Sequence, residues 1–146
     1  MGHVRVSAER VIDAPAKEIY RYIADYRQHH PRFLPPAFSN FTVEEGGYGA
    51  GTVLSFDFTV GNRTQHVRQQ VEEPESSHMI VERTLNQPQV TTFVVRPEGA
   101  QTRVRIEMVR ETRGFRGIVE RLLMPRLLLP VFRQELELLE HYAASQ

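Results

Sequence analysis

Two polar residues stand among apolar ones in segments whose hydrophobicity alternates with a period of two. Gln69 lies between Val67 and Val71, and Arg83 follows Val81 at the same spacing. Residues two apart in a β-strand point to the same face, so we expect both polar side chains to share a face with apolar ones. An amide or guanidinium in such surroundings could orient a ligand by binding its carbonyl group or its anionic end. Alternatively, Arg83 extends to solvent or pairs with Glu82 or Glu107.

The six histidines show no spacing typical of a metal site. His29 and His30 are adjacent, so their side chains would point about 100° apart on a helix and to opposite faces of a strand. We therefore expect no metal, and we interpret both residues as solvent-exposed loop histidines, with a general base at a pocket entrance as the alternative. The chain has no Cys, and it lacks the motifs of a serine nucleophile elbow or a phosphate-binding loop. No cofactor is expected.

The segments that must position these residues change character along the chain. Residues 4–12 alternate as a first strand, and residues 16–26 carry apolar side chains at helical spacing. From residue 38 to residue 112 the pattern has a period of two, with turn residues separating six strands. The period of a helix then returns over residues 117–144. This order predicts an α+β fold in a single domain of residues 1–146: a curved seven-stranded antiparallel sheet, short helical segments after the first strand, and a long C-terminal helix.

The last helix should bury one stripe of side chains against the sheet. That stripe comprises Ile118, Leu122, Pro125, Leu129, Phe132, Leu136, Leu139 and Ala143. Pro125 and Pro130 lie inside the helix, and each costs about 3 kcal/mol in an ordinary helix interior. We therefore expect the helix to kink or break between residues 123 and 131. Four apolar side chains outside the stripe would form an exposed patch: Leu123, Leu127, Leu128 and Val131.

Charge and composition exclude several classes of function. Basic and acidic residues balance at 18 each, so no global field favours nucleic acid. A local basic cluster is formed by Arg113, Arg116, Arg121 and Arg126. No apolar segment reaches the ~20 residues of a membrane span, and the start of the chain does not resemble a signal peptide. We expect a cytoplasmic protein that does not bind nucleic acid.

Several short motifs resemble those of one protein superfamily. They are Ile12, Asp13, Ala14 and Pro15 before the first helix, residues 22–26 with Pro31 and Phe33 after it, Gly51 and Thr52 at the start of a strand, and residues 71–74 at the end of one. With the long final helix, these motifs make the chain similar to START-like (SRPBCC, birch-pollen-allergen-like) proteins, and within them to the polyketide cyclase/dehydrase and lipid transport branch. The resemblance implies a helix-grip fold, in which the sheet wraps around the final helix and encloses a hydrophobic cavity.

This resemblance makes the apolar inner face a candidate ligand site, whereas the pattern alone favours a packed core. The residues expected to line the cavity are Leu54, Phe56, Phe58, Val67, Gln69, Arg83, Phe93, Ile106, Met108, Leu122, Leu129 and Phe132. We predict that they bind a hydrophobic small molecule such as a lipid, quinone or polyketide, and that the protein is a carrier or sensor.

Two other functions fit the sequence. In the same cavity, Arg83, Gln69 or Tyr48 could transfer protons in a polyketide cyclase or dehydrase reaction. Alternatively, the apolar segment of residues 123–131 could belong to an interaction module, through a homodimer contact or a transient contact with a membrane.

Overall fold

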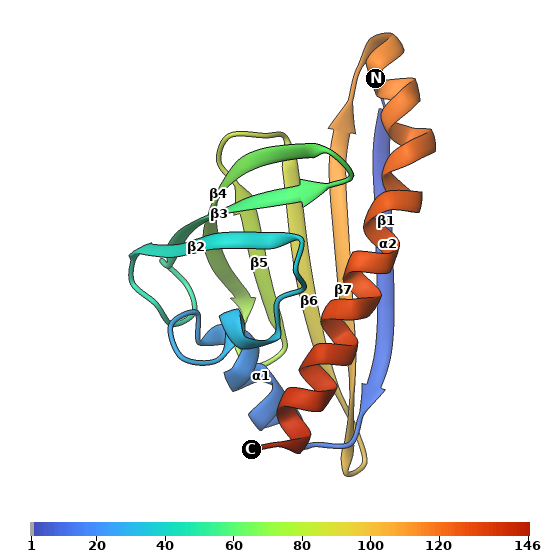
Figure 1. Cartoon of the computed structure of the whole chain (residues 1–146). Helices are drawn as coiled ribbons and strands as arrows, with labels where there is room; N and C mark the ends of the chain where they lie inside the picture. Colours follow the sequence, from blue (N-terminus) through green and yellow to red (C-terminus); the bar gives the residue numbers. More distant parts are fainter. Residues whose placement is uncertain (1) are drawn as a thin grey trace.

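The computed structural model describes residues 2–146, and Figure 1 shows a curved sheet that lies alongside one long helix. Seven antiparallel strands form the sheet in the order β1-β7-β6-β5-β4-β3-β2. The strands are β1 (Gly2–Ile12), β2 (Phe38–Glu45), β3 (Val53–Val60), β4 (Arg63–Glu75), β5 (Met79–Thr84), β6 (Gln89–Glu98) and β7 (Gln101–Thr112). Two short helices, α1 (Ala16–Ala24) and η1 (His30–Phe33), lie between β1 and β2, and α2 (Gly114–Ala144) follows β7. The predicted helix-grip fold is confirmed.

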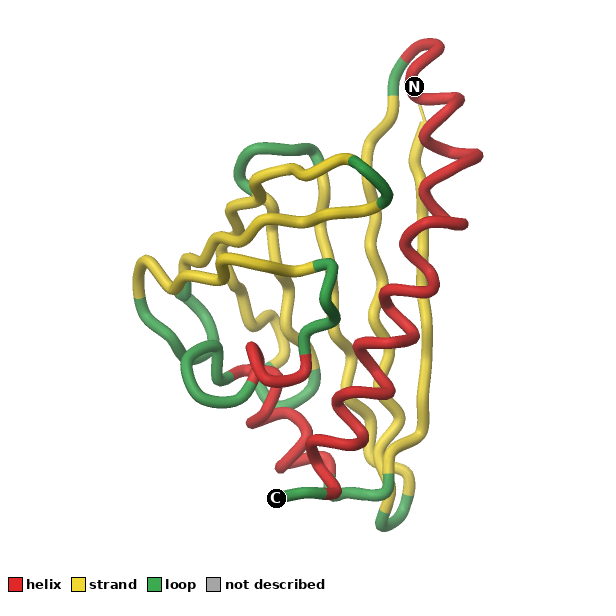
Figure 2. The backbone as a smooth tube through the Cα atoms, viewed as in Figure 1, coloured by secondary structure: helices red, strands yellow, loops and turns green. Residues whose placement is uncertain are grey.

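The sheet curls because its two sides run in different directions. β1 and β7 pair along their whole length, from Gly2 opposite Thr112 to Ile12 opposite Thr102. Figures 1 and 2 show β2, β3 and the start of β4 running across the direction of β1 and β7. Strand twist accumulates across a sheet in this way, and the result is a concave face that holds the core.

Period-two alternation sorts the side chains between the concave and convex faces. On β7, Val104, Ile106 and Met108 are buried in the core, as the pattern predicts. β5 differs from the prediction, because Ile80, Glu82 and Thr84 are buried whereas Arg83 is exposed. The assignment of Arg83 to the inner face was therefore wrong. Val81 is also buried, so β5 carries apolar side chains on both faces and its alternation was ambiguous.

Helix α2 packs mainly through its second half. Its buried residues include Phe132, Leu136 and Leu139, as predicted, but also Leu128, which was wrongly assigned to the exposed patch. Leu122, also expected to face the cavity, is 65% exposed. That expectation was wrong because α2 follows the edge strand β1, so its first half has sheet on one side only. In the first half, Gly117 lies close to the backbone of Thr112, where an added Cβ would be 3.0 Å from the Thr112 carbonyl carbon.

The same helix runs without interruption through Pro125 and Pro130, so of the expected kink or break, the break does not occur. A helical proline leaves the carbonyl four residues earlier without its usual donor, and here those carbonyls belong to Arg121 and Arg126. Both arginines are exposed, so water can reach this part of the helix and reduce the cost of each proline. Within residues 2–146, no helix combines the length and hydrophobicity needed to cross a membrane.

Helix α1 places Tyr26 at the edge of the core. The stripe predicted for this segment is buried, and it consists of Ile19, Tyr22, Ile23 and Tyr26. The helix ends at Ala24, after which the Asp25 carboxylate accepts hydrogen bonds from the backbone N–H groups of Arg27 and Gln28. The Tyr26 N–H donates to the Gly47 carbonyl at 2.8 Å. These bonds fix the backbone on both sides of Tyr26.

Candidate functional site

Four polar side chains lie buried where β5, η1 and the second half of α2 meet. Tyr26 follows α1, His30 begins η1, Glu82 lies on β5 and Glu135 on α2. His30 is 2% exposed, Glu82 7% and Glu135 3%. Ionisable side chains are rarely buried to this extent unless they are paired. We call these four residues the buried polar cluster.

One hydrogen bond and one ion pair join the members of the cluster in two pairs. The Tyr26 hydroxyl donates to Glu82 Oε2 at 2.7 Å, and His30 Nε2 lies 3.7 Å from Glu135 Oε2. On its other side, His30 Nδ1 donates to the Ile23 carbonyl at 2.7 Å. Within residues 2–146, no buried side-chain nitrogen or oxygen lacks a hydrogen-bond partner. The cluster is therefore a satisfied network, which is the condition for polar groups to persist in a core.

Aromatic rings hold His30 in its orientation. Its ring stacks on Tyr26, with ring centroids 4.6 Å apart, and on Phe33 at 4.7 Å. Phe93 from β6 approaches edge-on at 5.5 Å. These rings exclude water and restrict rotation of the imidazole, so its two nitrogens keep separate partners.

Burial and neighbouring charge shift the pKa values of the cluster. Burial raises the pKa of Glu82 from 4.5 to about 7, against the opposing effects of His30 and of the Tyr26 hydroxyl. Burial alone would lower the pKa of His30, but Glu135, Glu82 and the Ile23 carbonyl favour the imidazolium, and the net pKa is raised. Burial and the Glu82 carboxylate raise the pKa of Tyr26 well above its usual value. At neutral pH the cluster thus contains a carboxyl group close to its pKa beside a histidine that favours the charged form.

Glu82→Gln is expected to reduce the pH dependence of stability. A carboxyl group whose pKa is raised in the folded state stabilises the protein most below pH 4.5, and this contribution is lost as the pH rises to about 7. The loss is on the order of 3–4 kcal/mol, because each pKa unit corresponds to about 1.4 kcal/mol. Glutamine resembles the protonated carboxyl group, so the variant should be more stable than the wild type above about pH 7. Thermal unfolding over a series of pH values measures the difference.

The matched control for this experiment is Glu137→Gln, at an exposed position of α2. It should leave the pH profile unchanged. A smaller slope remains in Glu82→Gln, because the raised pKa of His30 also removes stability as the pH increases. Identical profiles for Glu82→Gln and the wild type would show that the pKa of Glu82 is not raised.

Three further polar side chains continue the cluster along the concave face. Gln69 on β4 donates through Nε2 to Thr84 Oγ1 on β5 at 3.4 Å, and Thr91 on β6 lies opposite Glu82 on β5. Gln69, Thr84 and Thr91 are all buried. The prediction that Gln69 faces inward is confirmed, and the middle of the concave face combines apolar side chains with hydrogen-bonding ones.

A surface pocket of about 330 Å³ lies beside the cluster, lined by Tyr26, Arg27, Pro31, Phe41 and Val43. Tyr26 belongs to both, because it lines this pocket and its hydroxyl bonds to Glu82, although the residue is only 1% exposed. A second surface pocket, of about 290 Å³, includes Arg83 and Val109 on the convex side of the sheet. Of these two pockets, the first is the one lined by a member of the buried polar cluster.

Most residues expected to line a cavity lie in one buried core, namely Leu54, Phe56, Val67, Gln69, Phe93, Ile106, Met108 and Phe132. Phe58 and Leu129 are partly buried and pack against that core. Contact of these residues with a ligand remains a prediction, because both pockets described above are lined by other side chains.

Arg83, Tyr48 and Leu122 do not join this core. Arg83 points outward and pairs with Glu72 at 3.2 Å, whereas the predicted partner was Glu82 or Glu107. Tyr48 is 56% exposed.

His29 contacts the Tyr142 hydroxyl through Nδ1 at 2.5 Å. Of the two adjacent histidines, His30 is thus the buried one, and its interpretation as an exposed loop residue was wrong.

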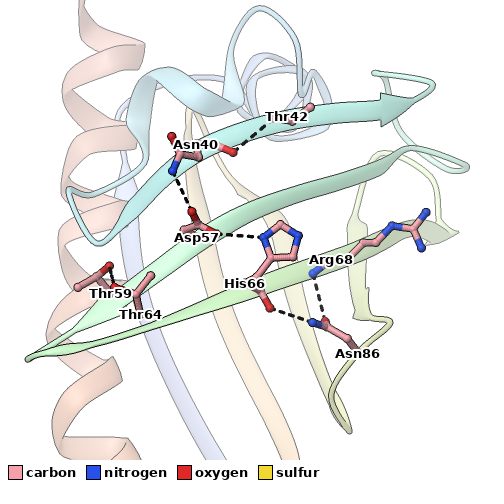
Figure 3. Close-up of polar contacts among 8 residues, drawn as sticks. All are labelled: Asn40, Thr42, Asp57, Thr59, Thr64, His66, Arg68 and Asn86. Carbon is pink, nitrogen blue, oxygen red and sulfur yellow. Dashed lines mark hydrogen bonds and ion pairs between the residues drawn. The ribbon is translucent and has the colours of Figure 1, made fainter.

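A second polar network lies on the convex side of β2, β3 and β4 (Figure 3). Asn40 donates to Asp57 at 2.8 Å, and His66 Nδ1 lies 3.0 Å from the same carboxylate. Hydrogen bonds from Asn40 and His66 lower the pKa of Asp57. These residues alternate with buried Phe56 and Val67 and so project away from the core. The Asn40–Asp57–His66 contacts link β2, β3 and β4. Among the described residues, no three His, Cys, Asp or Glu side chains could hold a metal ion together.

The chain matches one known protein family over nearly its whole length. A family model described as polyketide cyclase / dehydrase and lipid transport matches residues 3–144. The chain belongs to this family. The match includes every strand and both α-helices, so the resemblance inferred from the sequence motifs is confirmed. A search of curated proteins finds no match.

Solved structures of other proteins share the fold. The NMR structure of the KanY protein superposes with a TM-score of 0.86 at 26% sequence identity and covers 99% of each chain. A START superfamily protein from Mycobacterium smegmatis has a TM-score of 0.76 at 16% identity, again over 99% of each chain. The Zhui aromatase/cyclase from a Streptomyces species has a TM-score of 0.75 at 17% identity, over 98% of this chain and 94% of its own. At such low identities the last two show likeness of fold alone.

Proposed function

We propose that this member of the polyketide cyclase / dehydrase and lipid transport family binds a hydrophobic small molecule between the sheet and α2, as a carrier or sensor. Its apolar part would lie against side chains such as Leu54, Phe93 and Phe132, which are buried on the concave face. A lipid, quinone or polyketide has the required combination of a large apolar surface and a carbonyl or hydroxyl group.

The observation that carries this proposal is the buried polar cluster within an otherwise apolar core. Ligand sites of this kind are mostly apolar, with a few fixed polar groups that orient the ligand. Tyr26 lines a surface pocket and its buried hydroxyl bonds to Glu82, so a ligand that displaces core side chains would place its polar end on this hydroxyl. The loosely packed first half of α2 would move to admit the apolar part.

Tyr26→Phe is expected to weaken binding of a pyrene-labelled fatty alcohol by about five- to tenfold, the usual effect of losing one hydrogen bond. Fluorescence titration of the purified protein measures the affinity, and native mass spectrometry detects any ligand that co-purifies. Tyr48→Phe is the matched control, because Tyr48 is 56% exposed and should leave the affinity unchanged. A wild-type protein that neither takes up the alcohol nor carries a co-purifying ligand would contradict the proposal.

One observation favours a second function, catalysis of a cyclase or dehydrase reaction at the same place. Burial raises the pKa of Glu82 to about 7, which is where a general base or acid works best at neutral pH. Glu82 would take a proton from a carbon next to a ketone, and the charged His30 would stabilise the resulting enolate. Turnover of a poly-β-ketone by the wild type that is lost in Glu82→Gln, with binding retained, would favour this function over simple carriage.

A further inference from the structure

The first half of α2 presents an apolar face to solvent. Its exposed large side chains range from 37% to 81% exposed, and they are Phe115, Ile118, Val119, Leu122, Leu123 and Leu127. Successive helical residues lie about 100° apart, which puts Phe115 and Leu122 on the side of the helix away from the buried Gly117 and Leu128. We call this surface the α2 apolar face. It is separate from the core, and its side chains are contiguous, unlike the single exposed apolar residues found on most proteins.

Between positions 113 and 127, the charged side chains without an ion-pair partner among residues 2–146 are all positive. Glu120 is the one acidic residue between positions 113 and 127, and it pairs with Arg110 at 2.8 Å. Arg113, Arg116 and Arg126 are exposed, and none of them forms an ion pair with any residue from 2 to 146. The α2 apolar face is thus bordered by three cations without acidic partners.

We propose that the α2 apolar face binds the surface of an anionic lipid bilayer. Phe115 and Leu122 would enter the boundary between head groups and acyl chains, while Arg113, Arg116 and Arg126 would contact the lipid phosphates. Three arginines at an anionic surface strengthen binding by roughly a hundredfold. We infer this partner because the arginines complement the charge of lipid phosphates and the exposed apolar side chains complement acyl chains.

A second copy of the chain fits the same face less well. A symmetric dimer brings a surface against itself, so the three arginines of each copy would meet without acidic partners. Figure 1 shows the start of α2 beyond the β3–β4 hairpin, at one end of the molecule, where it can reach a flat surface. Docking of this face does not require a ligand in the core, so the two proposals can fail separately.

Vesicle co-sedimentation tests the proposal. We expect the wild-type protein to sediment with phosphatidylcholine vesicles that contain phosphatidylglycerol, to bind vesicles of phosphatidylcholine alone weakly, and to dissociate as salt is added. The double variant Phe115→Ser, Leu122→Ser should lose at least about tenfold in binding to the anionic vesicles. The double variant Arg113→Gln, Arg116→Gln should lose more than about tenfold and should depend less on salt, since Arg126 remains.

Matched controls are Leu85→Ser and Arg96→Gln, which change an exposed leucine and an exposed arginine outside the α2 apolar face. Both should sediment as the wild type does, and all variants should unfold at the wild-type temperature because they alter exposed side chains. Wild-type protein that stays in the supernatant with anionic vesicles would overturn the proposal. So would unchanged sedimentation of the Phe115→Ser, Leu122→Ser variant, or a wild-type dimer that this variant dissociates while no vesicles are bound.

Discussion

Glu135→Ala is expected to lower the free energy of unfolding by about 3–5 kcal/mol at neutral pH, the cost of leaving one partner of a buried ion pair without the other. Glu135 is 3% exposed and His30 is 2% exposed, so water cannot replace the lost carboxylate. The pKa of His30 is raised in the intact protein, and without Glu135 its imidazolium loses one of the two carboxylates that favour it. Urea unfolding measured by circular dichroism gives the free energy directly.

Glu137→Ala on the same helix is the control, because Glu137 is exposed and its loss should change the stability by less than about 0.5 kcal/mol. Equal destabilisation by the two variants would show that His30 and Glu135 do not form a pair. The double variant His30→Leu, Glu135→Leu should recover most of the loss, since apolar residues of similar size often replace a buried pair without cost. A double variant that is stable but no longer binds the pyrene-labelled fatty alcohol would show that His30 and Glu135 serve ligand binding.

The seven strands could be predicted because their alternation is visible in the sequence. On β3, Leu54, Phe56 and Phe58 follow each other at intervals of two, and this spacing gave both the strand and its inner face. β5 shows where the method fails. Val81 is buried on one face, and Ile80 and Glu82 on the other, so the apolar pattern could not decide which face carries the core. Arg83 was assigned to the wrong face for this reason.

The face of α2 could be predicted only where the sheet lies under it. Helical spacing correctly placed Phe132, Leu136 and Leu139 in the core. The same spacing includes Leu122, which is exposed because the helix runs along the edge strand β1. The position of a helix over a sheet depends on packing between distant segments, and the periodicity of one segment carries no information about it.

The buried polar cluster escaped prediction because its members are far apart in sequence and polar in type. Glu135 shares a helical face with Phe132 and Leu139, and this spacing was the available sign that it is buried. Glu82 alternates with Ile80 and Thr84 in the same way. In both cases the spacing indicated a buried glutamate, but the general preference of glutamate for the surface favoured exposure. The burial of His30 depends on η1, whose orientation follows from packing and not from local pattern.

Aromatic side chains of the core pack around the buried polar cluster. Phe33 and Phe93 fit against His30, and the ring centroid of His30 lies 4.7 Å and 5.5 Å from theirs. The same side chains would have to yield to a ligand. A measurement of how tightly they are packed therefore bears on the proposed function.

Phe93→Ala provides that measurement and is expected to lower the free energy of unfolding by about 3–5 kcal/mol, the range for removing a well-packed phenylalanine. Phe93 is 2% exposed, whereas Phe115, its matched control, is 81% exposed and should tolerate alanine with a change below about 0.5 kcal/mol. The cost rises with the volume of the void that the neighbours cannot fill. A cost near that of Phe115→Ala would mean that space already exists beside Phe93 and that a ligand can enter without displacing side chains. A cost in the full range would mean that binding requires α2 to move, because the concave face is filled in the unliganded protein.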